Sequence, residues 1–290
     1  MKKKKKILGC ANVGKKYGLR KKNLKIKEFE KIFKFGIKNN IYYFDTAVDY
    51  GKSEKLLGNV IGNYRKNIKI ITKLPKRKKF NNFDQEIQDQ VLKSIKRLGV
   101  KSLYTLHIHE PNMLLKKDRF KIYNSLLKLK KRNLIKNIGV SVYTVAELKK
   151  ILKMFKIDVV QIPINLLDNR FIKNNFLKKI KSKVKEIHAR SIFLKGLLLK
   201  DKISRPKYFD RWPILRKMDN YFNQRKVSRL ATCINFVFSF DEIDKVIIGV
   251  SSKSQLSKIL KIQKKAEKVN TFPNLNVADN RLLIPKYWKI

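Results

Sequence analysis

The chain alternates short runs of β-branched and aliphatic residues with longer segments whose apolar residues recur every three or four positions. The short runs predict eight strands, at residues 5–10, 41–46, 68–72, 102–109, 135–142, 159–165, 185–192 and 244–250. The longer segments predict amphipathic helices between them, as at 28–39, 84–99, 120–133, 144–155 and 176–184. Strands and helices in regular alternation indicate parallel strands with helices packed outside them.

The number of predicted strands favours a closed sheet over an open one. Eight strands in 290 residues fit a (β/α)8 TIM barrel, whose usual length is about 250 residues. A doubly wound open sheet is the alternative, but it usually carries a glycine-rich phosphate turn after an early strand. Residues 7–14, "ILGCANVG", have only a Gly-x-x-x-x-Gly spacing. No linker-like segment divides the chain, so one domain over residues 1–290 is predicted.

Composition narrows the class of protein. The 43% hydrophobic content suffices for one substantial core, and no run approaches the roughly 20 apolar residues of a membrane span. The basic start "MKKKKK" is followed by a short, glycine-broken stretch, so no export signal is predicted and a cytoplasmic location is expected. Cys10 and Cys233 lie far apart, which indicates buried thiols rather than a disulfide framework or a zinc site. No metal site is predicted.

Charge is the most unusual property of the chain. It has 71 Lys and Arg against 22 Asp and Glu, a formal net charge of +49. Such a balance attracts polyanions without sequence preference. The lysines, however, are spread over nearly every segment and alternate with apolar residues at helical spacing, which is typical of solvated helix faces. The solvated-face interpretation is favoured, and a genuine polyanion contact is the alternative.

Candidate chemistry gathers where the predicted strands end. In a barrel the carboxyl ends of the strands carry the reactive residues. The second strand ends in Asp45 with Tyr50 in the loop beyond, the third ends in Lys73, and the fourth ends in His107 and His109. Lys73 offers Asp45 an opposite charge and is expected to lower the pKa of the Tyr50 phenol from about 10. A phenol tuned in this way can protonate a carbonyl oxygen.

Several stretches, in order along the chain, resemble the aldo-keto reductase family. Residues 44–58, "FDTAVDYGKSEKLLG", are similar to its Asp-Thr-Ala … Tyr-Gly … Ser-Glu … Leu-Gly signature. The resemblance extends from about residue 6 to 288 through "LGCANVGKKYGL", "ITK", "IHEP", "IGVSVY", "VVQIPINLLD", "RSIFLKGLLL" and "IIGVSSKSQL". The tail "DNRLLIPKYW" resembles endings in a bacterial branch associated with surface-sugar and glycan pathways.

The resemblance implies NAD(P)H-dependent reduction of a carbonyl to an alcohol. It makes Tyr50 the general acid, Lys73 and Asp45 the pair that tunes it, and a histidine the group that orients the substrate carbonyl. His107 and His109 point to the same face of their strand, because side chains alternate along it. His109 precedes the Glu-Pro that ends the strand and is favoured, and His107 is the alternative.

The same resemblance implies a set of cofactor-binding residues. NADPH is favoured, with NADH possible, and the family uses no metal. Ser141 and Gln161 fall at positions for the nicotinamide carboxamide, and Gly196 at a loop over the pyrophosphate. The full set is Ser141, Gln161, Asn165, Gly196, Ser251, Ser252 and Lys253.

Three features leave parts of this picture open. Val142 stands where the family often has Asn, and Arg190 where many members stack an aromatic ring, with Phe193 nearby. Residues 200–243 are expected to form a loop and extra helices that shape specificity. The predicted partner is a small carbonyl compound, with a sugar derivative as one candidate, and no pattern specifies an oligomeric state. The competing function is a non-catalytic, reductase-like barrel that binds nucleic acid or another anionic surface through its charge.

Overall fold

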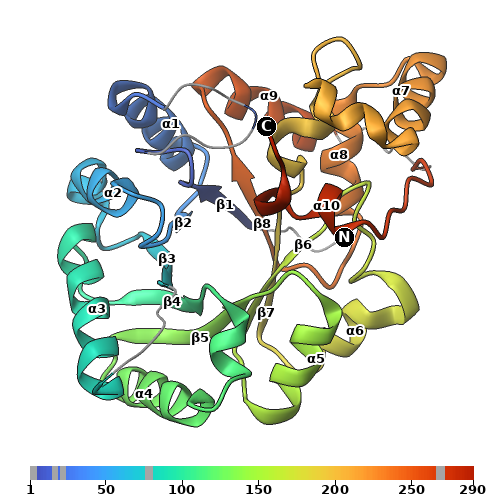
Figure 1. The fold of residues 1–290 in the computed structure, drawn as a ribbon. Coiled ribbons are helices and arrows are strands. Elements are labelled where there is room, and N and C mark those ends of the chain that lie inside the picture. Colours follow the sequence, from blue (N-terminus) through green and yellow to red (C-terminus); the bar gives the residue numbers. More distant parts are fainter. Residues whose placement is uncertain (1–4, 15–18, 20–23, 76–80, 266–271) are drawn as a thin grey trace.

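Eight parallel strands close into a barrel in the computed structural model, which describes residues 5–14, 19, 24–75, 81–265 and 272–290 (Figure 1). Each strand pairs with the next along the chain, and β8 pairs with β1 to complete the circle. The strands are β1 Lys5–Gly9, β2 Tyr43–Asp45, β3 Lys69–Leu74, β4 Leu103–Ile108, β5 Ile135–Ser141, β6 Val159–Pro163, β7 Glu186–Arg190 and β8 Lys245–Gly249.

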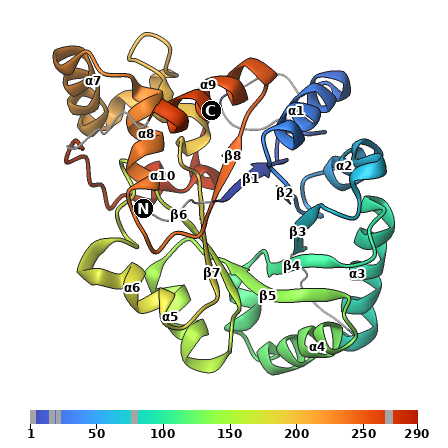
Figure 2. The ribbon, with the colours of Figure 1, turned by 180° about the vertical axis from the view of Figure 1, so that it is seen from behind.

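Helices surround the barrel, as the views from the two sides show (Figures 1 and 2). They are α1 Ile26–Lys38, α2 Ser53–Ile61, α3 Phe83–Leu98, α4 Arg119–Lys131, α5 Val145–Met154, α6 Phe176–Lys181, α7 Pro213–Arg225, α8 Arg229–Phe238, α9 Lys253–Lys265 and α10 Asn280–Leu283. Short 3-10 helices include η4 Leu194–Leu199 and η5 Lys207–Arg211. The predicted (β/α)8 class is therefore confirmed.

Local sequence explains why these elements form where they do. Helix α1 buries Phe29, Ile32, Phe33 and Ile37, which lie on one face at helical spacing and pack against the strands. Helix α5 begins with a capping box: the Thr144 side chain accepts a hydrogen bond from the backbone N–H of Glu147, and the Glu147 carboxylate accepts one from the backbone N–H of Thr144. Burial of such stripes, more than helix propensity, stabilises the outer layer.

The predicted elements agree with the structure to within a few residues. All eight strands are present, although the strand expected at 41–46 is only three residues long. The segment 200–243 contains η5, α7 and α8, so the expected loop with extra helices is present. Residues 15–18 of the opening motif lie outside the described residues. Both cysteines are buried thiols.

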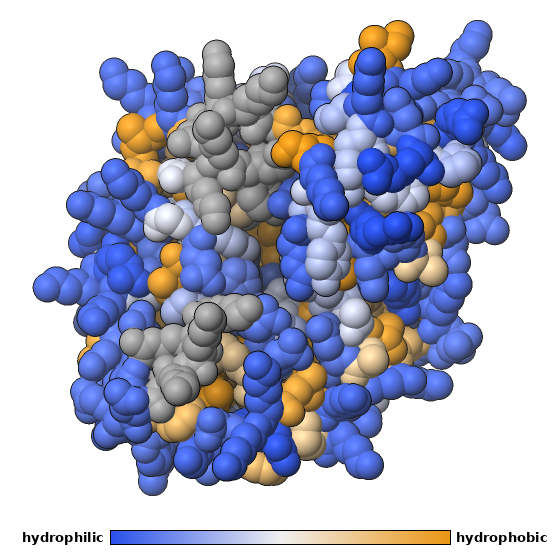
Figure 3. Space-filling view, in the orientation of Figure 1, coloured by the Kyte–Doolittle hydropathy of each residue, from blue (hydrophilic) through white to orange (hydrophobic). Residues whose placement is uncertain are grey.

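The exterior is predominantly hydrophilic on the face seen in Figure 3, with scattered hydrophobic residues between the charged ones. Lysines occupy the exposed positions of helices such as α4, whose last turn carries three of them. Within the described ranges, no helix is both long enough and apolar enough to cross a bilayer.

A cluster of ionisable side chains closes the barrel near the N-terminal ends of the strands. Glu186 stands at its centre: it accepts hydrogen bonds from the Tyr104 hydroxyl at 2.5 Å and pairs with the Lys245 ammonium at 2.5 Å. Its other oxygen lies 2.7 Å from Nε2 of His188. We call Tyr104, Glu186, His188 and Lys245 the N-terminal cluster. The Glu186 carboxylate is bonded by the other three side chains, which is how buried charge is ordinarily tolerated.

Candidate active site

A cavity of about 1150 Å³ opens at the C-terminal ends of the strands. Its wall is built from the loops that follow β1, β2, β4, β5, β7 and β8, together with the C-terminal tail. It exceeds the roughly 300–1,000 Å³ of most small-molecule sites. In a barrel of parallel strands this is the end at which loops bring reactive groups together.

A buried ion pair lies at the base of this cavity. The Lys73 ammonium donates to both oxygens of the Asp45 carboxylate, at 2.8 and 2.7 Å, and to the backbone carbonyl of Thr46 at 2.8 Å. Lys73 is 1% exposed and Asp45 5%. The two side chains come from the ends of adjacent strands, β2 and β3, and each satisfies the charge of the other.

Tyr50 sits above this pair. A turn in which its backbone N–H donates to the carbonyl of Ala47 carries it from β2 to the cavity wall, where the Lys73 ammonium lies 4.9 Å from the ring centroid. Burial of the phenol, and then the nearby Asp45 carboxylate, raise its pKa well above the usual value, and Arg190 opposes them. The pKa is thus raised and not lowered as expected, because burial and the Asp45 carboxylate outweigh the cationic groups nearby. Tyr50 is therefore a protonated phenol in the free protein.

The two histidines at the end of β4, His107 within the strand and His109 just after it, occupy different environments. His109 lines the cavity, and its ring meets that of Tyr50 edge to face with centroids 5.8 Å apart. Its Nδ1 lies 3.0 Å from an Asp49 carboxylate oxygen. His107 is fully buried one layer below, against Gly139, where a Cβ would lie 2.4 Å from its Nδ1. Only His109, of these two, borders the cavity.

A chain of hydrogen bonds links the β5 and β6 candidates to the ion pair. The Ser141 hydroxyl donates to the Gln161 carbonyl at 3.3 Å, and the Gln161 amide donates to Asp45 at 2.9 Å. Both Ser141 and Gln161 line the cavity. Asp45, Lys73, Gln161 and Ser141 thus form one continuous polar floor. We call Asp45, Tyr50, Lys73 and His109 the C-terminal cluster.

Three of the predicted cofactor residues lie outside the cavity wall. Asn165 is fully buried, and its amide bonds Ser191 and two backbone N–H groups of its own turn. Ser252 directly precedes α9, and its hydroxyl accepts a hydrogen bond from the backbone of residue 255. The Lys253 backbone donates to Glu28, and its ammonium lies 5.6 Å from the Phe35 ring centroid. The position of these residues near the ends of strands does not reveal that they lie outside the cavity wall.

The other predicted residues do border the cavity. Ser251 lies at its wall beside the start of α9, and Gly196 lies in the loop after β7. At Gly196 the backbone has φ +92°, and a Cβ there would have no heavy atom within 4 Å. This conformation favours glycine, and the free space lets a ligand approach the backbone closely.

Several lining residues were not predicted from the sequence. Gln255 and Lys258 line the cavity from α9. Residues three or four positions apart lie on the same face of a helix, so both share the face that continues from Ser251. Helical periodicity counted from Ser251 would have selected them in place of Lys253. Asn12, in the loop after β1, donates to the carbonyl of Val250 at 2.7 Å and joins the β1 and β8 loops.

Arg190 ends β7 inside the cavity wall. Its guanidinium stacks on the Tyr143 ring, 4.1 Å from the centroid, and donates to the carbonyl of Val142 at 2.9 Å. Phe193 lines the cavity nearby. At the position where many members of the family stack an aromatic ring, the Arg190 guanidinium therefore stacks on Tyr143.

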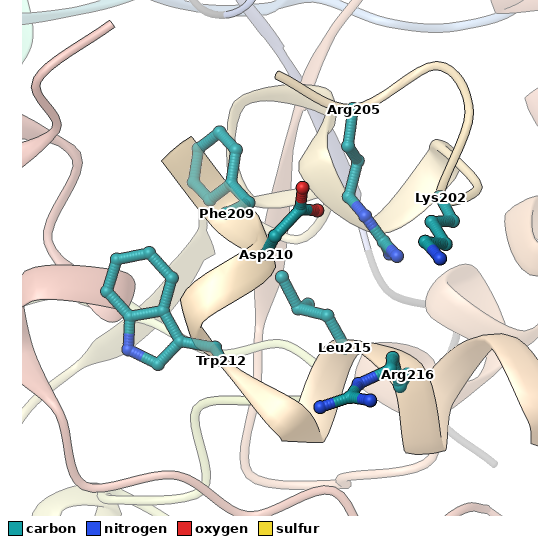
Figure 4. A pocket seen from close by; sticks show the side chains of 7 residues that line it. All are labelled: Lys202, Arg205, Phe209, Asp210, Trp212, Leu215 and Arg216. Carbon is teal, nitrogen blue, oxygen red and sulfur yellow. The ribbon is translucent and has the colours of Figure 1, made fainter. Parts of the chain in front are cut away.

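A second, smaller hollow of about 230 Å³ lies between η5 and the first turn of α7 (Figure 4). Its walls are Lys202, Arg205, Phe209, Asp210, Trp212, Leu215 and Arg216. Arg205 is held by the buried Asp219, which also pairs with Arg229. None of the predicted catalytic residues borders it, whereas Asp45, Tyr50 and His109 line the larger cavity.

Comparison with known proteins agrees with this geometry. The model of the aldo/keto reductase family matches residues 7–273. An uncharacterized oxidoreductase of Schizosaccharomyces pombe is 33% identical over 141 residues, which are 45% of this chain and 44% of the yeast protein. The chain thus aligns with less than half the length of that curated relative.

Solved structures share the fold. A Pseudomonas aeruginosa protein described as an aldo-keto reductase is 19% identical with a TM-score of 0.67, over 90% of both chains. The holo form of an aldo-keto reductase from Bacillus halodurans is 18% identical with a TM-score of 0.73, over 90% of this chain and 86% of that one. At such identities the likeness concerns the fold alone.

Proposed function

The chain belongs to the aldo/keto reductase family, and from this premise we propose that it reduces a carbonyl compound to an alcohol with NAD(P)H. The observation that carries the proposal is the base of the cavity, where the Lys73–Asp45 pair lies beneath the Tyr50 ring. A buried ion pair below a protonated phenol, open to a large cavity, suits proton donation to an oxygen that becomes negative.

Each member of the C-terminal cluster has a defined role in this proposal. Tyr50 donates its proton to the carbonyl oxygen as negative charge develops there. Lys73 stabilises the phenolate left behind, and Asp45 holds the ammonium in place. His109 hydrogen-bonds the same oxygen and orients it. The cluster is set before substrate arrives, so little reorganisation opposes the reaction.

The lining residues fit a nicotinamide dinucleotide. The cofactor, when bound, supplies the hydride that reaches the carbonyl carbon. Ser141 and Gln161 offer a hydroxyl and an amide beside Asp45, as a carboxamide requires, and Gly196 leaves its backbone accessible. Lys195, Lys200, Lys258 and Arg229 line the cavity and supply positive charge for phosphates.

A fluorescence titration tests cofactor binding. Trp288 lines the cavity, so bound cofactor should quench tryptophan emission. Purified protein at near-physiological salt is titrated with NADPH and with NADH, with a Trp288→Phe variant to identify the reporting residue. Saturable quenching supports the proposal. Absence of binding by either cofactor up to millimolar concentration would refute it.

We propose NADPH as the preferred form, on the strength of Lys258 in the cavity wall. Lys258→Met should weaken NADPH binding about tenfold, roughly 1.4 kcal/mol, and leave NADH binding within twofold. Lys253→Met is the matched control, because Lys253 belongs to the same helix but its ammonium lies against Phe35. If both variants weaken NADPH binding equally, or if Lys258→Met weakens NADPH and NADH binding equally, Lys258 is not the origin of a preference for NADPH.

We propose a sugar or sugar-derived aldehyde as substrate class, supported by the many polar groups of the wall. None of the relatives reported above is described by its substrate. A screen with NADPH would compare glyceraldehyde, aldoses and 4-nitrobenzaldehyde. Faster turnover of the polar aldehydes supports a sugar-derived substrate, and turnover of the aromatic aldehyde alone would exclude that class.

We also propose a cytoplasmic location for the protein.

The net charge of +49 favours a second activity, non-specific contact with polyanions. Such binding is independent of the cavity and should fall steeply with salt. Binding of a 30-mer single-stranded DNA that survives 300 mM salt, in protein that binds neither cofactor, would favour the non-catalytic barrel instead.

A further inference from the structure

We propose that Arg190 binds an anionic group of the substrate, a carboxylate or a phosphate, so that the preferred carbonyl compound is a charged one. This inference rests on the proposed function and narrows its substrate class to aldehydes or ketones that carry such a group, as sugar acids and sugar phosphates do. Arg190 ends β7 and borders the same cavity as Tyr50. The sequence pattern gave it no role in substrate binding.

The cavity wall carries two groups of cations. Six lysine and arginine side chains line it among the described residues, and the proposed function gives four of them to the phosphates of the cofactor. The other two are Arg190 and Lys286, and both lie near the ring of Tyr143. The guanidinium carbon is 4.1 Å from the centroid of that ring and the ammonium 5.7 Å. A second cationic region is thus formed by β7 and the C-terminal tail.

Arg190 lies at the end of the cavity where the proposed reaction occurs. Burial and then the Asp45 carboxylate raise the pKa of the Tyr50 phenol, and the charge of Arg190 opposes them, so the guanidinium is within electrostatic reach of the acid. The nicotinamide ring that reacts beside this acid carries no negative charge. An anion bound by Arg190 therefore comes from the substrate.

No carboxylate of the described residues forms an ion pair with either cation. Three carboxylates of the cavity wall are bonded to other groups, namely Asp45 to Lys73, Asp49 to His109, and Glu147 to the backbone N–H groups of residues 143 and 144. The fourth, Glu110, lies in the wall after β4 and pairs with neither Arg190 nor Lys286. Positive charge that is not neutralised in a cavity with low-dielectric walls attracts an anionic ligand.

The guanidinium is held in place and still has donors to offer. Nη2 donates to the Val142 carbonyl at 2.9 Å, and Nη1 donates to the Ser191 hydroxyl at 3.2 Å. Each terminal nitrogen carries two N–H groups, so each keeps one that no described residue accepts. Stacking on Tyr143 fixes the plane of the guanidinium. A planar fork of this kind matches the oxygens of a carboxylate or phosphate, and its order before binding lowers the entropic cost.

Two pairs of substrates test the effect of charge. 4-Carboxybenzaldehyde and 4-nitrobenzaldehyde have nearly the same planar shape, but only the first is an anion at neutral pH. Glyceraldehyde 3-phosphate and glyceraldehyde form the corresponding pair for a phosphate. In at least one pair, wild type with saturating NADPH should show a kcat/KM about 10- to 100-fold higher for the anionic member, the effect of a hydrogen bond between charged groups. The pair with the larger ratio identifies the anionic group.

Variants show whether Arg190 is the origin of this ratio. Arg190→Met should bring the ratio close to that expected without charge recognition, about 1, chiefly by raising KM for the anionic member. Arg190→Lys should keep part of it, because it retains the charge without the planar fork. Any effect on Tyr50 acts on both members of a pair and cancels in the ratio.

The C-terminal tail offers a matched pair of lysines. Lys286→Met should reduce the ratio about two- to threefold, because this ammonium is exposed and its charge is screened by solvent. Lys289→Met removes the same charge from the same tail outside the cavity wall and should match wild type. Equal effects of the two variants would exclude Lys286 from the site.

Cofactor binding separates this inference from a role toward NADPH. Without substrate, Arg190→Met should bind NADPH within threefold of wild type, measured by tryptophan quenching. A wild type with no preference in either pair, or a preference that survives in Arg190→Met, would overturn the inference. Loss of NADPH affinity as large as the loss of the ratio would also overturn it, because the guanidinium would then serve the cofactor. Wild-type protein that binds neither NADPH nor NADH would instead refute the proposed function.

Discussion

The two ends of the barrel interior hold clusters with the same side-chain types. The C-terminal cluster and the N-terminal cluster each combine a carboxylate, a lysine, a tyrosine and a histidine. In the N-terminal cluster the Tyr104 hydroxyl and Lys245 are bonded to Glu186 at 2.5 Å. In the C-terminal cluster the Asp45 carboxylate is bonded to Lys73, and Tyr50 lines the wall of a cavity of about 1150 Å³.

The comparison teaches that residue types do not define a site by themselves. The Tyr104 hydroxyl already donates a hydrogen bond to the Glu186 carboxylate, and burial together with Glu186 raises its pKa. The pKa of Tyr50 is raised as well, first by burial, but its cluster faces space that a ligand can fill. What distinguishes the end proposed to be reactive is a phenol next to space for an acceptor.

The largest expected effect concerns the two tyrosines. Tyr50→Phe should lower steady-state turnover of 4-nitrobenzaldehyde by about 10²–10⁴-fold and leave the NADPH dissociation constant within twofold. Tyr104→Phe, the same change at the other end, should leave turnover unchanged and lower the free energy of unfolding by about 1.5–3 kcal/mol, the worth of a hydrogen bond to a charged group. A comparable loss of turnover in both variants would remove the functional difference between the ends.

Substitution of Lys73 and of Lys245 should lower the free energy of unfolding by different amounts. Lys73→Met leaves Asp45 buried with only Gln161 and should cost about 3–5 kcal/mol in urea unfolding, besides the loss of turnover. Lys245→Met should cost about 1–2 kcal/mol, because Glu186 keeps its bonds to His188 and Tyr104. Equal costs would contradict the assigned partners.

The buried histidines should make stability depend on pH. Burial lowers the pKa of both His107 and His188, so the folded protein keeps them neutral while the unfolded chain protonates them below about pH 6.5. The unfolded state then binds more protons, and stability falls as pH drops. At pH 5 each histidine should cost up to about 2 kcal/mol relative to pH 7. Urea unfolding of His188→Gln should show a smaller loss, and an unchanged pH slope would exclude His188 as a cause.

The smallest expected effect concerns the thiols. Burial raises the pKa of Cys10 far above its usual range and that of Cys233 to about 12. Neither forms a thiolate at neutral pH, so a colourless disulfide reagent should react with native protein only at the rate of unfolding. Rapid labelling of one thiol, measured by mass spectrometry, would show that its part of the barrel opens independently.

The sequence predicted most of the fold because each strand and helix repeats its own hydrophobic period. It also predicted Asp45, Tyr50, Lys73 and His109 as one group, because parallel strands in a barrel end on the same side. It could not place Asn165 or Lys253, because their contacts are with residues distant in the sequence. The Asn165 amide donates to the Ser191 carbonyl, and the Lys253 ammonium lies over the Phe35 ring. The raised pKa of Tyr50 likewise depends on burial, which no local pattern encodes.

The most direct test of the central claim is a stopped-flow single turnover. Wild type and Tyr50→Phe, each with NADPH already bound, are mixed with excess 4-nitrobenzaldehyde, and loss of absorbance at about 340 nm reports hydride transfer apart from binding and product release. The account predicts that wild type transfers hydride and that the variant, with equal NADPH affinity, is slower by about 10²–10⁴-fold. Equal rates in the two proteins would contradict it.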